Sequence, residues 1–545
     1  MIKVSFKDKI INVQKGITVQ ELLANEIAKT NALGCFCNNE ICTLNYKIKK
    51  DTKIELINYD HIEGKKIYNR GIIYIMAKAL EEMFPDALLN IKYEMNGAIF
   101  CDFVNMESTD ELLKLLKARM LEITKKNLPI EIRKMSLEEA EKFYKKEHTF
   151  KGRAQLNSKL KEGVTLYFCD GYYNYLYGVM PISTGVIKTY DIQKYKSGFF
   201  VCYPKLDDIN TIHKAKESKR LFNILAERDD INRALGVDIL YKLNEKVRKS
   251  DITNYILLAE ALHEKKIANI ADKISARKDV KIVLIAGPTS SGKTTFARRL
   301  GLQLRLNGFN LVTISVDNYF KEREDTPKDE DGNYDFENIE AIDLDLFNLH
   351  LQKLLSGEEI EVPTFDFITG RKIFDGKKMR LKDDEILVVE GIHCLNDRLT
   401  SIIDKQNKFK IYISALAVLG IDFHNKISTI DTRLIRRIAR DYQFRGYSAK
   451  YTLEMWASVR RGESKYIEPF IEDADMMFNS ALVYEMGVLK DYVLPLLEKI
   501  DNSVPEYSEA NRLITLLNFF ESIQTDAIPR TSLLREFIGG GVFEV

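Results

Sequence analysis

Residues 287–294 read GPTSSGKT, a glycine-rich spacing that is typical of a phosphate-binding loop between a strand and a helix. Gly287 and Gly292 would let the backbone fold round phosphate oxygens, while loop N–H groups and the helix N-terminus supply partial positive charge. Lys293 would reach the β- and γ-phosphates of ATP, and the Thr294 hydroxyl would ligate Mg²⁺. The residues predicted to hold the nucleotide are Gly287, Ser290, Ser291, Gly292, Lys293, Thr294 and Thr295.

Two acidic residues stand at the ends of later apolar runs. Asp317 ends FNLVTISVD (309–317), and Glu390 lies near the end of EILVVEG (385–391). If both runs are parallel strands, the two carboxylates meet the phosphate loop at one edge of the sheet. One could take a proton from an acceptor hydroxyl and the other could position Mg²⁺. Each acid taken singly could equally be a solvated strand end or a helix cap.

A row of arginines forms the next candidate feature, in the segment DTRLIRRIARDYQFRG (431–446). The spacing i, i+3, i+4 and i+7 places four guanidinium groups on one helix face. Such a face is commonly solvated, but it could also be a lid that neutralises charge as a phosphoryl group transfers. The four residues are Arg433, Arg436, Arg437 and Arg440.

The elements that must position these residues are strands that alternate with helices from residue 281 onward. The apolar runs at 281–287, 309–317, 385–391 and 409–415 are short, rich in β-branched residues and apolar on both faces. Strands buried in a parallel sheet have this composition. The pattern therefore predicts a doubly wound α/β domain whose ligands lie beyond the C-terminal strand ends.

The bulk composition is that of an ordinary globular protein. The 545 residues are 45% hydrophobic and 30% charged, and 81 basic residues nearly balance 80 acidic ones, so net charge argues for neither nucleic acid nor an anionic membrane. Seven scattered cysteines suit a reducing compartment. Neither a signal peptide nor a long apolar stretch is evident, and we therefore expect a cytoplasmic protein without membrane spans.

The motifs, in this order, resemble the uridine kinase/phosphoribulokinase group of P-loop kinases over roughly residues 280–485. The landmarks are GPTSSGKTT, SVDNYF, YDFENIEAIDLDLF, EVPTFDF, VVEGIH and the arginine-rich helix. The resemblance implies a kinase that uses ATP and Mg²⁺ to phosphorylate a hydroxyl group. It implies catalytic roles for Asp317, Lys293, Arg436 and Arg440, ATP binding by Arg433, and metal binding by Thr294, Glu390 and Asp317.

The residues that match the acceptor pocket of uridine kinases depart from the family pattern. Phe320 stands where the second-strand motif usually ends in tyrosine, and Gly370 stands where a histidine reads the pyrimidine. Phe365 falls at the base-stacking tyrosine, while Glu337, with Asp335 nearby, corresponds to the acid that holds ribose hydroxyls. A site without its hydrogen-bonding partner discriminates less strongly between bases.

The acceptor class therefore stays open among a nucleoside, a sugar and a sugar phosphate. A sugar-phosphate kinase of the phosphoribulokinase type needs extra basic residues near the acceptor. Arg371 and Lys372 are the candidates, although the sequence GRK could equally form a turn.

The N-terminal half resembles other proteins. Residues 1–60 resemble the TGS domain, and residues 63–205 resemble the editing domain of threonyl-tRNA synthetases, on KALEEMFPDA (78–87) and CDGYYNYLYGVMPISTGVIK (169–188). Active editing domains carry HxxxH and CxxxH, a four-ligand set of the zinc type. The matching residues are Arg70, Tyr74, Cys169 and Tyr173, so we expect neither a metal ion nor editing.

The sequence thus predicts a multidomain protein, with α+β modules followed by an α/β P-loop kinase domain with a parallel sheet. The predicted parts are a TGS-like domain (1–62), an editing-like domain (63–215), a helical connector (216–278), the kinase domain (279–500) and a tail that packs on it (501–545). The front half, residues 1–215, could contact RNA. An ATP-dependent regulator bound to RNA or the ribosome is therefore an alternative function. Kinases of this kind are often multimeric, which leaves a homo-oligomer open.

Overall fold

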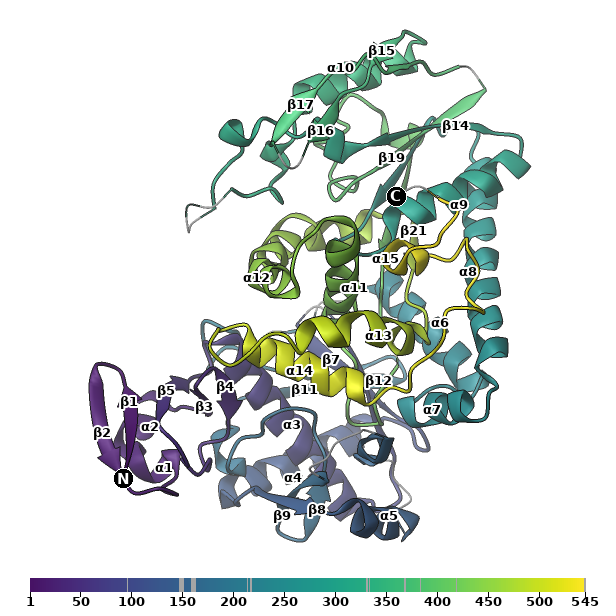
Figure 1. Ribbon diagram of the computed structural model, residues 1–545. Coiled ribbons are helices and arrows are strands. Elements are labelled where there is room, and N and C mark those ends of the chain that lie inside the picture. The colour runs from purple at the N-terminus through teal and green to yellow at the C-terminus, as the bar shows by residue number, and fades with distance from the viewer. Residues whose placement is uncertain are drawn as a thin grey trace.

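The computed structural model shows a chain built of two halves that lie against one another (Figure 1). The α+β modules of the N-terminal half lie at the bottom of that view, and the sheet of the C-terminal half lies at the top. Helix α9 (Lys293–Leu306) of the C-terminal half lies far from the N-terminus in this view. The structure describes residues 1–543 apart from 96, 147–150, 158–162, 213, 216–217, 330–331, 333, 367–368, 383 and 418.

The first module is a mixed five-stranded sheet with two short helices. Its strands follow the order β2-β1-β5-β3-β4, and β1 runs antiparallel to β2 but parallel to β5. Val4, Val19 and Ile54 are buried in its core. The elements are β1 (Ile2–Phe6), β2 (Lys9–Val13), α1 (Val19–Leu22), α2 (Ala24–Thr30), β3 (Gly34–Cys37), β4 (Glu40–Cys42) and β5 (Thr52–Ile57).

The second module surrounds one long helix, α3 (Ile62–Met83), most of whose residues are buried. This helix starts at Ile62, because the His61 ring accepts a hydrogen bond from the Glu63 N–H and caps it. Sheets of four strands (β11-β12-β7-β6) and three strands (β10-β9-β8) complete the module. Its other elements are β6 (Leu89–Met95), β7 (Ala98–Phe103), α4 (Asp110–Lys126), β8 (Glu131–Met135), α5 (Leu137–Lys146), β9 (Val164–Cys169), β10 (Tyr172–Asn174), β11 (Asp191–Tyr195) and β12 (Gly198–Cys202).

Three helices connect the two halves, in the region predicted to be helical. They are α6 (Lys219–Ala234), α7 (Leu240–Arg248) and α8 (Ile252–Ser275). The last of them packs along α9, where Ile267 and Ile270 share a hydrophobic core with Phe296 and Leu300. In Figure 1, α8 lies next to the sheet of the C-terminal half.

The C-terminal half is built on a five-stranded sheet in which every neighbouring pair is parallel, as predicted. The order is β14-β19-β13-β20-β21, so β13, which leads into the phosphate loop, lies at the centre. The strands are β13 (Ile282–Ala286), β14 (Asn310–Ser315), β19 (Glu385–Glu390), β20 (Lys408–Ser414) and β21 (Met476–Asn479).

Two details of this sheet differ from the prediction. The second strand was predicted to extend to Asp317, but β14 ends at Ser315 and Asp317 lies in a 3₁₀ turn (Val316–Tyr319). The strand pairing ends where Ser315 meets Glu390, so the chain is free to turn at the edge of the sheet. The edge strand β21 has only four residues, too few for a clear pattern in the sequence.

Smaller elements and helices surround the sheet. Two short hairpins and α10 form one end of the molecule in Figure 1, and α11 to α14 lie between the sheet and the N-terminal half. These elements are α10 (Leu344–Leu355), β15 (Ile360–Glu361), β16 (Thr364–Asp366), β17 (Arg371–Ile373), β18 (Lys378–Met379), α11 (Thr429–Phe444), α12 (Ala449–Tyr466), α13 (Glu485–Leu497), α14 (Tyr507–Asn518) and α15 (Arg535–Ile538).

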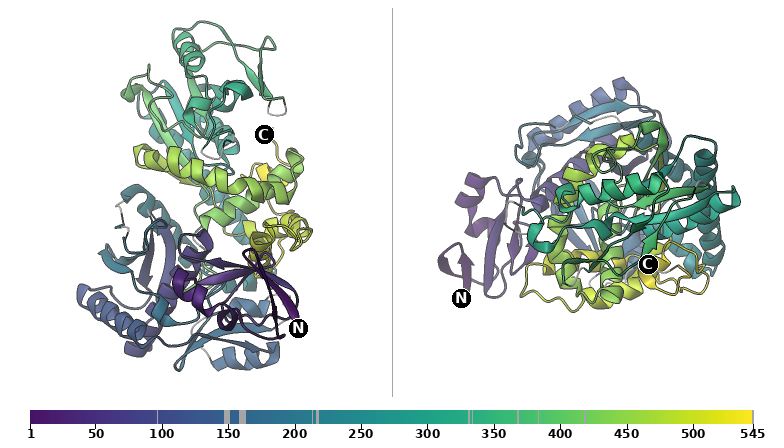
Figure 2. Two further views of the ribbon diagram at one scale, coloured as in Figure 1. Left: turned by 90° about the vertical axis from the view of Figure 1, so that its left-hand side faces the viewer. Right: turned by 90° about the horizontal axis from the view of Figure 1, so that it is seen from above.

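The C-terminal tail contacts both halves. Helix α14 packs on α13 and also lies against β4 of the first module, as Figure 2 shows from a second side. The Tyr177 hydroxyl donates to the Arg512 carbonyl oxygen, and the Asn39 side-chain amide donates to the Asn502 carbonyl oxygen (3.1 Å). The tail therefore joins the two halves, in addition to the predicted packing on the kinase part.

Candidate phosphoryl-transfer site

The phosphate loop lies between β13 and α9, and its two glycines are needed for its shape. Gly292 caps α9 with a left-handed backbone (φ 87°), which side chains disfavour. At Gly287, a Cβ atom would lie 2.1 Å from the Ile413 carbonyl oxygen, so no side chain fits. The loop therefore takes the form that the GPTSSGKT spacing predicts.

The hydroxyl groups of the loop indicate what it binds. The Oγ atoms of Ser290 and Ser291 are buried, and neither has a hydrogen-bond partner among the described residues. Leaving a buried hydroxyl unpaired is costly, and oxygens of a bound anion would satisfy it. Lys293 Nζ lies 3.5 Å from the Pro288 carbonyl oxygen, folded over the loop. These groups fit the phosphates of a nucleotide.

The two strand-end acids come together beside this loop, as the strand order predicts. Glu390 accepts a hydrogen bond from Ser315 Oγ across the β14–β19 pair (2.9 Å). Burial, and next the negative charge of Asp317, raise the pKa of Glu390 to about 7, although Lys293 acts in the opposite direction. Two carboxylates and one ammonium group thus interact at one sheet edge, where the carboxylate oxygens are ligands that suit Mg²⁺.

Glu337 is a third carboxyl group in the same cluster. Burial, and next the charge of Glu463, raise its pKa to about 7, while Arg437 and Lys293 lower it and Asp317 raises it. Its Cβ packs closely on α12, where a Cβ at Gly462 would lie 2.3 Å away. Glu337 was predicted to bind substrate, and the structure brings it to the loop and the acids.

The other predicted substrate residues lie in different surroundings, from the hydrophobic core to the protein surface. Phe320 and Phe365 are buried with ring centroids 5.5 Å apart. Asp335 accepts a hydrogen bond from the Tyr466 hydroxyl of α12 (2.9 Å). Arg371 is exposed on β17, whereas its neighbour Lys372 donates to Asp343 (2.5 Å).

Gly370 lies next to a basic side chain that the sequence reasoning missed. Gly370 has a left-handed backbone (φ 70°), and a Cβ there would lie 2.7 Å from Arg323 Nε. The Arg323 N–H donates to the Gly370 carbonyl oxygen (2.9 Å). The space of the histidine that uridine kinases carry is therefore taken by Arg323.

Helix α11 uses its arginines in two ways, neither of which is a solvated face. Arg433 and Arg436 are buried. Arg433 donates to Glu463 (2.6 Å), and Arg436 donates to Glu485 and to the Ser290 carbonyl oxygen of the phosphate loop (2.8 and 3.4 Å). These two guanidinium groups are held by buried carboxylates beside the loop.

The remaining arginines share Asp441. Arg437 and Arg440 donate to this buried carboxylate at 3.1 and 2.8 Å. Arg437 lowers the pKa of Glu337, so its charge reaches the acid cluster. Burial and the charge of Arg440 lower the pKa of Arg445, with Asp441 and Asp317 opposing them. Arg437, a member of the predicted lid, therefore acts on Glu337 through its charge, and Arg445, to which the sequence assigned no role, interacts with the charges of Asp441 and Asp317.

The tail adds one more acid to the loop. Glu536 of α15 accepts hydrogen bonds from the Thr295 hydroxyl (2.9 Å) and the Thr295 N–H (3.3 Å). No motif in the sequence marks Glu536, because the contact joins residues far apart along the chain.

The residues that match editing-domain metal ligands are engaged in other contacts. Arg70 donates to the Val179 carbonyl oxygen (2.8 Å), and the Tyr74 hydroxyl donates to the Tyr167 carbonyl oxygen (2.9 Å). Tyr173 packs against Phe143, and Cys169 is buried. Within the described part of the chain, no group of three or more His, Cys, Asp or Glu residues could hold a metal ion.

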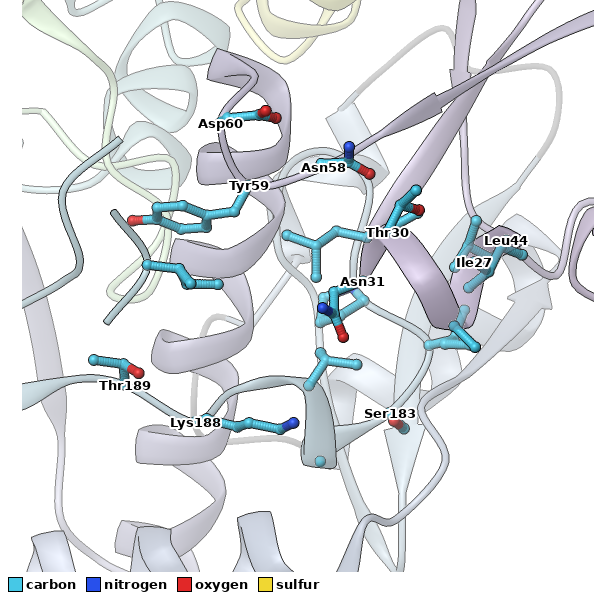
Figure 3. A pocket seen from close by; sticks show the side chains of 18 of the residues that line it. Ile27, Thr30, Asn31, Leu44, Asn58, Tyr59, Asp60, Ser183, Lys188 and Thr189 are labelled. Atoms are coloured by element: carbon cyan, nitrogen blue, oxygen red, sulfur yellow. The ribbon is translucent and has the colours of Figure 1, made fainter. Parts of the chain in front are cut away.

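A cleft of about 660 Å³ lies in the N-terminal half, far from the phosphate loop. Figure 3 shows Asn31, Asn58, Tyr59 and Lys188 around it, from the end of α2, the segment between β5 and α3, and the segment before β11. Separately, none of the helices that the structure describes is both long and apolar enough to cross a membrane.

The two halves of the chain are similar to two different kinds of known protein. Residues 282–485 match the model of the Phosphoribulokinase / Uridine kinase family. Uridine kinase of Halobacterium salinarum is 29% identical over 195 residues, which cover 35% of this chain and 77% of that protein. A solved structure of a possible uridine kinase from Bacillus stearothermophilus is 20% identical and covers 39% of this chain and 97% of its own, with a TM-score of 0.25.

The N-terminal half is similar to a different enzyme. Threonine–tRNA ligase of Clostridium kluyveri is 35% identical over 148 residues, which cover 26% of this chain. This chain spans only 23% of the length of that relative. The similarity agrees with the resemblance of the editing-like module.

Proposed function

We propose that this chain is an ATP-dependent phosphotransferase that phosphorylates a hydroxyl group of a nucleoside, because residues 282–485 match the model of the phosphoribulokinase/uridine kinase family. One observation carries the proposal: the phosphate loop with Lys293 follows β13, whose Ile285 pairs with Glu390 of β19, so the loop and this acid lie at one edge of the sheet. Phosphoryl transfer needs positioning and charge compensation above all, and this edge supplies both.

Each residue has a distinct part in the proposed reaction. Asp317 accepts the proton of the attacking hydroxyl, and Lys293 compensates charge on the phosphates. Glu390 and Thr294, with Asp317, would hold Mg²⁺, which would neutralise phosphate charge. Arg437 lies close enough to the acids to assist. Arg440 remains a proposed catalytic group, while the ion pairs of Arg433 and Arg436 favour a role in holding the loop.

The acceptor pocket supports a flat or ring-shaped substrate. The rings of Phe320 and Phe365 form an apolar wall, and Glu337 offers an acceptor for sugar hydroxyls. A nucleoside fits these groups. Arg323 beside Gly370 favours the alternative, a sugar phosphate, because a guanidinium group binds phosphate well.

The test is ATP turnover by the full chain against nucleosides, pentoses and pentose phosphates. We expect one class to stimulate ADP release, and Asp317→Asn to lower kcat by at least ~10²-fold, as for loss of a general base. Asp345→Asn is the matched control, since Asp345 is an exposed carboxylate in the first turn of α10. Equal, unstimulated turnover by all three proteins across the panel contradicts the proposal.

A second function is proposed for the N-terminal half. Its similarity to threonine–tRNA ligase supports an RNA-contacting module without editing, because the metal-ligand residues are replaced. Gel-shift assays with tRNA at two salt concentrations test this proposal. We expect the full chain to bind more tRNA than a control protein does. Equal retention by the control contradicts it. A cytoplasmic location and a homo-oligomer stay predictions.

A further inference from the structure

The C-terminal segment 532–538 lies directly on the phosphate loop and is not part of the family match at 282–485. The Glu536 side chain is 7% exposed, and its Oε2 atom accepts from both the Thr295 hydroxyl and the Thr295 N–H. A carboxylate of the same chain thus binds the first turn of α9, the helix that follows the loop.

Thr295 is in the part of this helix that would bind a nucleotide phosphate. It is the third residue of α9, and the N–H groups of a first helical turn have no partner within the helix. Together with the helix dipole, these groups make the ordinary binding site for phosphate. One N–H and one hydroxyl cannot serve Glu536 and a phosphate oxygen at full strength at the same time.

Neighbouring side chains hold the segment in this position. Leu533 is buried in the core with Phe296, and its Cδ2 atom lies 3.2 Å from where a Cβ on Gly292 would be. On the other side, the Phe537 ring lies 4.9 Å from the guanidinium carbon of Arg436, which itself donates to the loop. Glu536 lies between these two anchors.

The charge of Glu536 also reaches the proposed metal site. Among the charges that raise the pKa of Glu390 is that of Glu536, after burial and Asp317. A further negative group beside bound phosphates opposes their binding, and the opposition is strong where water is excluded. The observed position of Glu536 is therefore more favourable when the nucleotide site is empty than when phosphates are bound there.

We propose that Glu536 is an internal competitor for the nucleotide-donor site: its carboxylate occupies the phosphate-binding groups of Thr295 and must swing away when ATP binds. This inference rests on the proposed ATP-dependent function. Because Leu533 and Phe537 hold the backbone, rotation of one side chain is enough, and the segment acts as a gate without leaving the loop. The gate lowers the affinity for ATP and makes nucleotide binding depend on the tail.

The experiment measures the Kd for ATP by titration calorimetry on the full chain. Glu536→Gln keeps the size of the side chain and removes its charge, so we expect the Kd to fall by ~10-fold or more, the equivalent of about 1.4 kcal/mol. Glu536→Asp shortens the reach to Thr295, and we expect a smaller fall. Glu521→Gln is the control, because Glu521 is a tail carboxylate that pairs with Arg248 instead.

The outcomes separate the gate from the kinase proposal. If all proteins bind ATP with one Kd, or Glu536→Gln binds more weakly, the gate is refuted while ATP binding stands. If neither the parent nor either Glu536 variant binds ATP, both proposals fail together. If Glu536→Gln does not fold, as shown by its thermal unfolding curve, the Kd of Glu536→Asp decides: a fall supports the gate, and an unchanged value refutes it.

Discussion

Replacing Arg436 by methionine tests whether this arginine stabilises the fold or takes part in catalysis. Its side chain is 0% exposed, and its donors contact Glu485, the Ser480 carbonyl oxygen and the Ser290 carbonyl oxygen. Removing it leaves the Glu485 carboxylate buried without its partner. Breaking a buried ion pair in this way costs about 3–5 kcal/mol, a large part of the 5–15 kcal/mol that is usual for a folded domain.

The assay is urea unfolding followed by tryptophan fluorescence. Trp456 is the only tryptophan of the chain and packs in the core beside α11, near Arg433. We expect Arg436→Met to lower the free energy of unfolding reported there by about 3–5 kcal/mol. Arg445→Gln serves as the control, because its pairing with Asp441 is long (3.6 Å) and half-exposed, which predicts a loss below about 1 kcal/mol.

A second variant separates two effects on stability: the loss of the ion pair and the cavity that the smaller methionine leaves. In Arg436→Met/Glu485→Leu no charge is left unpaired, so we expect much of the lost stability to return. A loss below about 1 kcal/mol in Arg436→Met, combined with a large fall in kcat, would refute the reasoning and return Arg436 to the catalytic role predicted from the sequence.

Two further predictions concern the acid cluster and the acceptor pocket. Burial raises the pKa of Glu390 to about 7 in the fold, above its ordinary value of 4.5, so its contribution to stability is fully present below about pH 4.5 and is lost as the pH rises through about 7. Thermal unfolding without Mg²⁺ should therefore show a falling melting temperature over this range, and Glu390→Gln should flatten it; an identical slope in the variant would contradict the assignment. Gly370→His should not create a uridine-reading site, because the left-handed backbone and Arg323 exclude the side chain. We expect it to lower the melting temperature, with Gly376→His, at an equally left-handed but open position, as the control for backbone strain alone; unchanged stability together with improved uridine turnover would show that the pocket has room.

Local pattern was enough to predict the centre of the proposed site. The loop at 287–294 can be recognised from a short stretch of sequence, because its glycines, Lys293 and Thr294 are neighbours in the chain. Asp317 and Glu390 could be added because parallel strands that follow one another must end at the same edge. Even there the prediction placed Asp317 at the end of a strand, whereas it lies in the turn that follows.

Arginine roles could not be predicted in the same way. Helical periodicity showed that four arginines share a face but not what that face meets. The partners Glu463 and Glu485 lie on α12 and α13, and only the packing of these helices makes Arg433 and Arg436 buried ion-pair members. Arg437, on the same stripe, reaches the acids instead.

The sequence by itself determined the shape of the loop at residues 287–294, the parallel sheet around it, and the replacement of metal ligands in the N-terminal half. Each of these depends on residue type and short-range spacing. Only the tertiary structure decided that Glu536 contacts Thr295, that Arg323 takes the space beside Gly370, and which carboxylate each arginine of α11 pairs with. Such contacts depend on how distant segments pack, because burial and charge pairing arise only when the folded chain brings those side chains together.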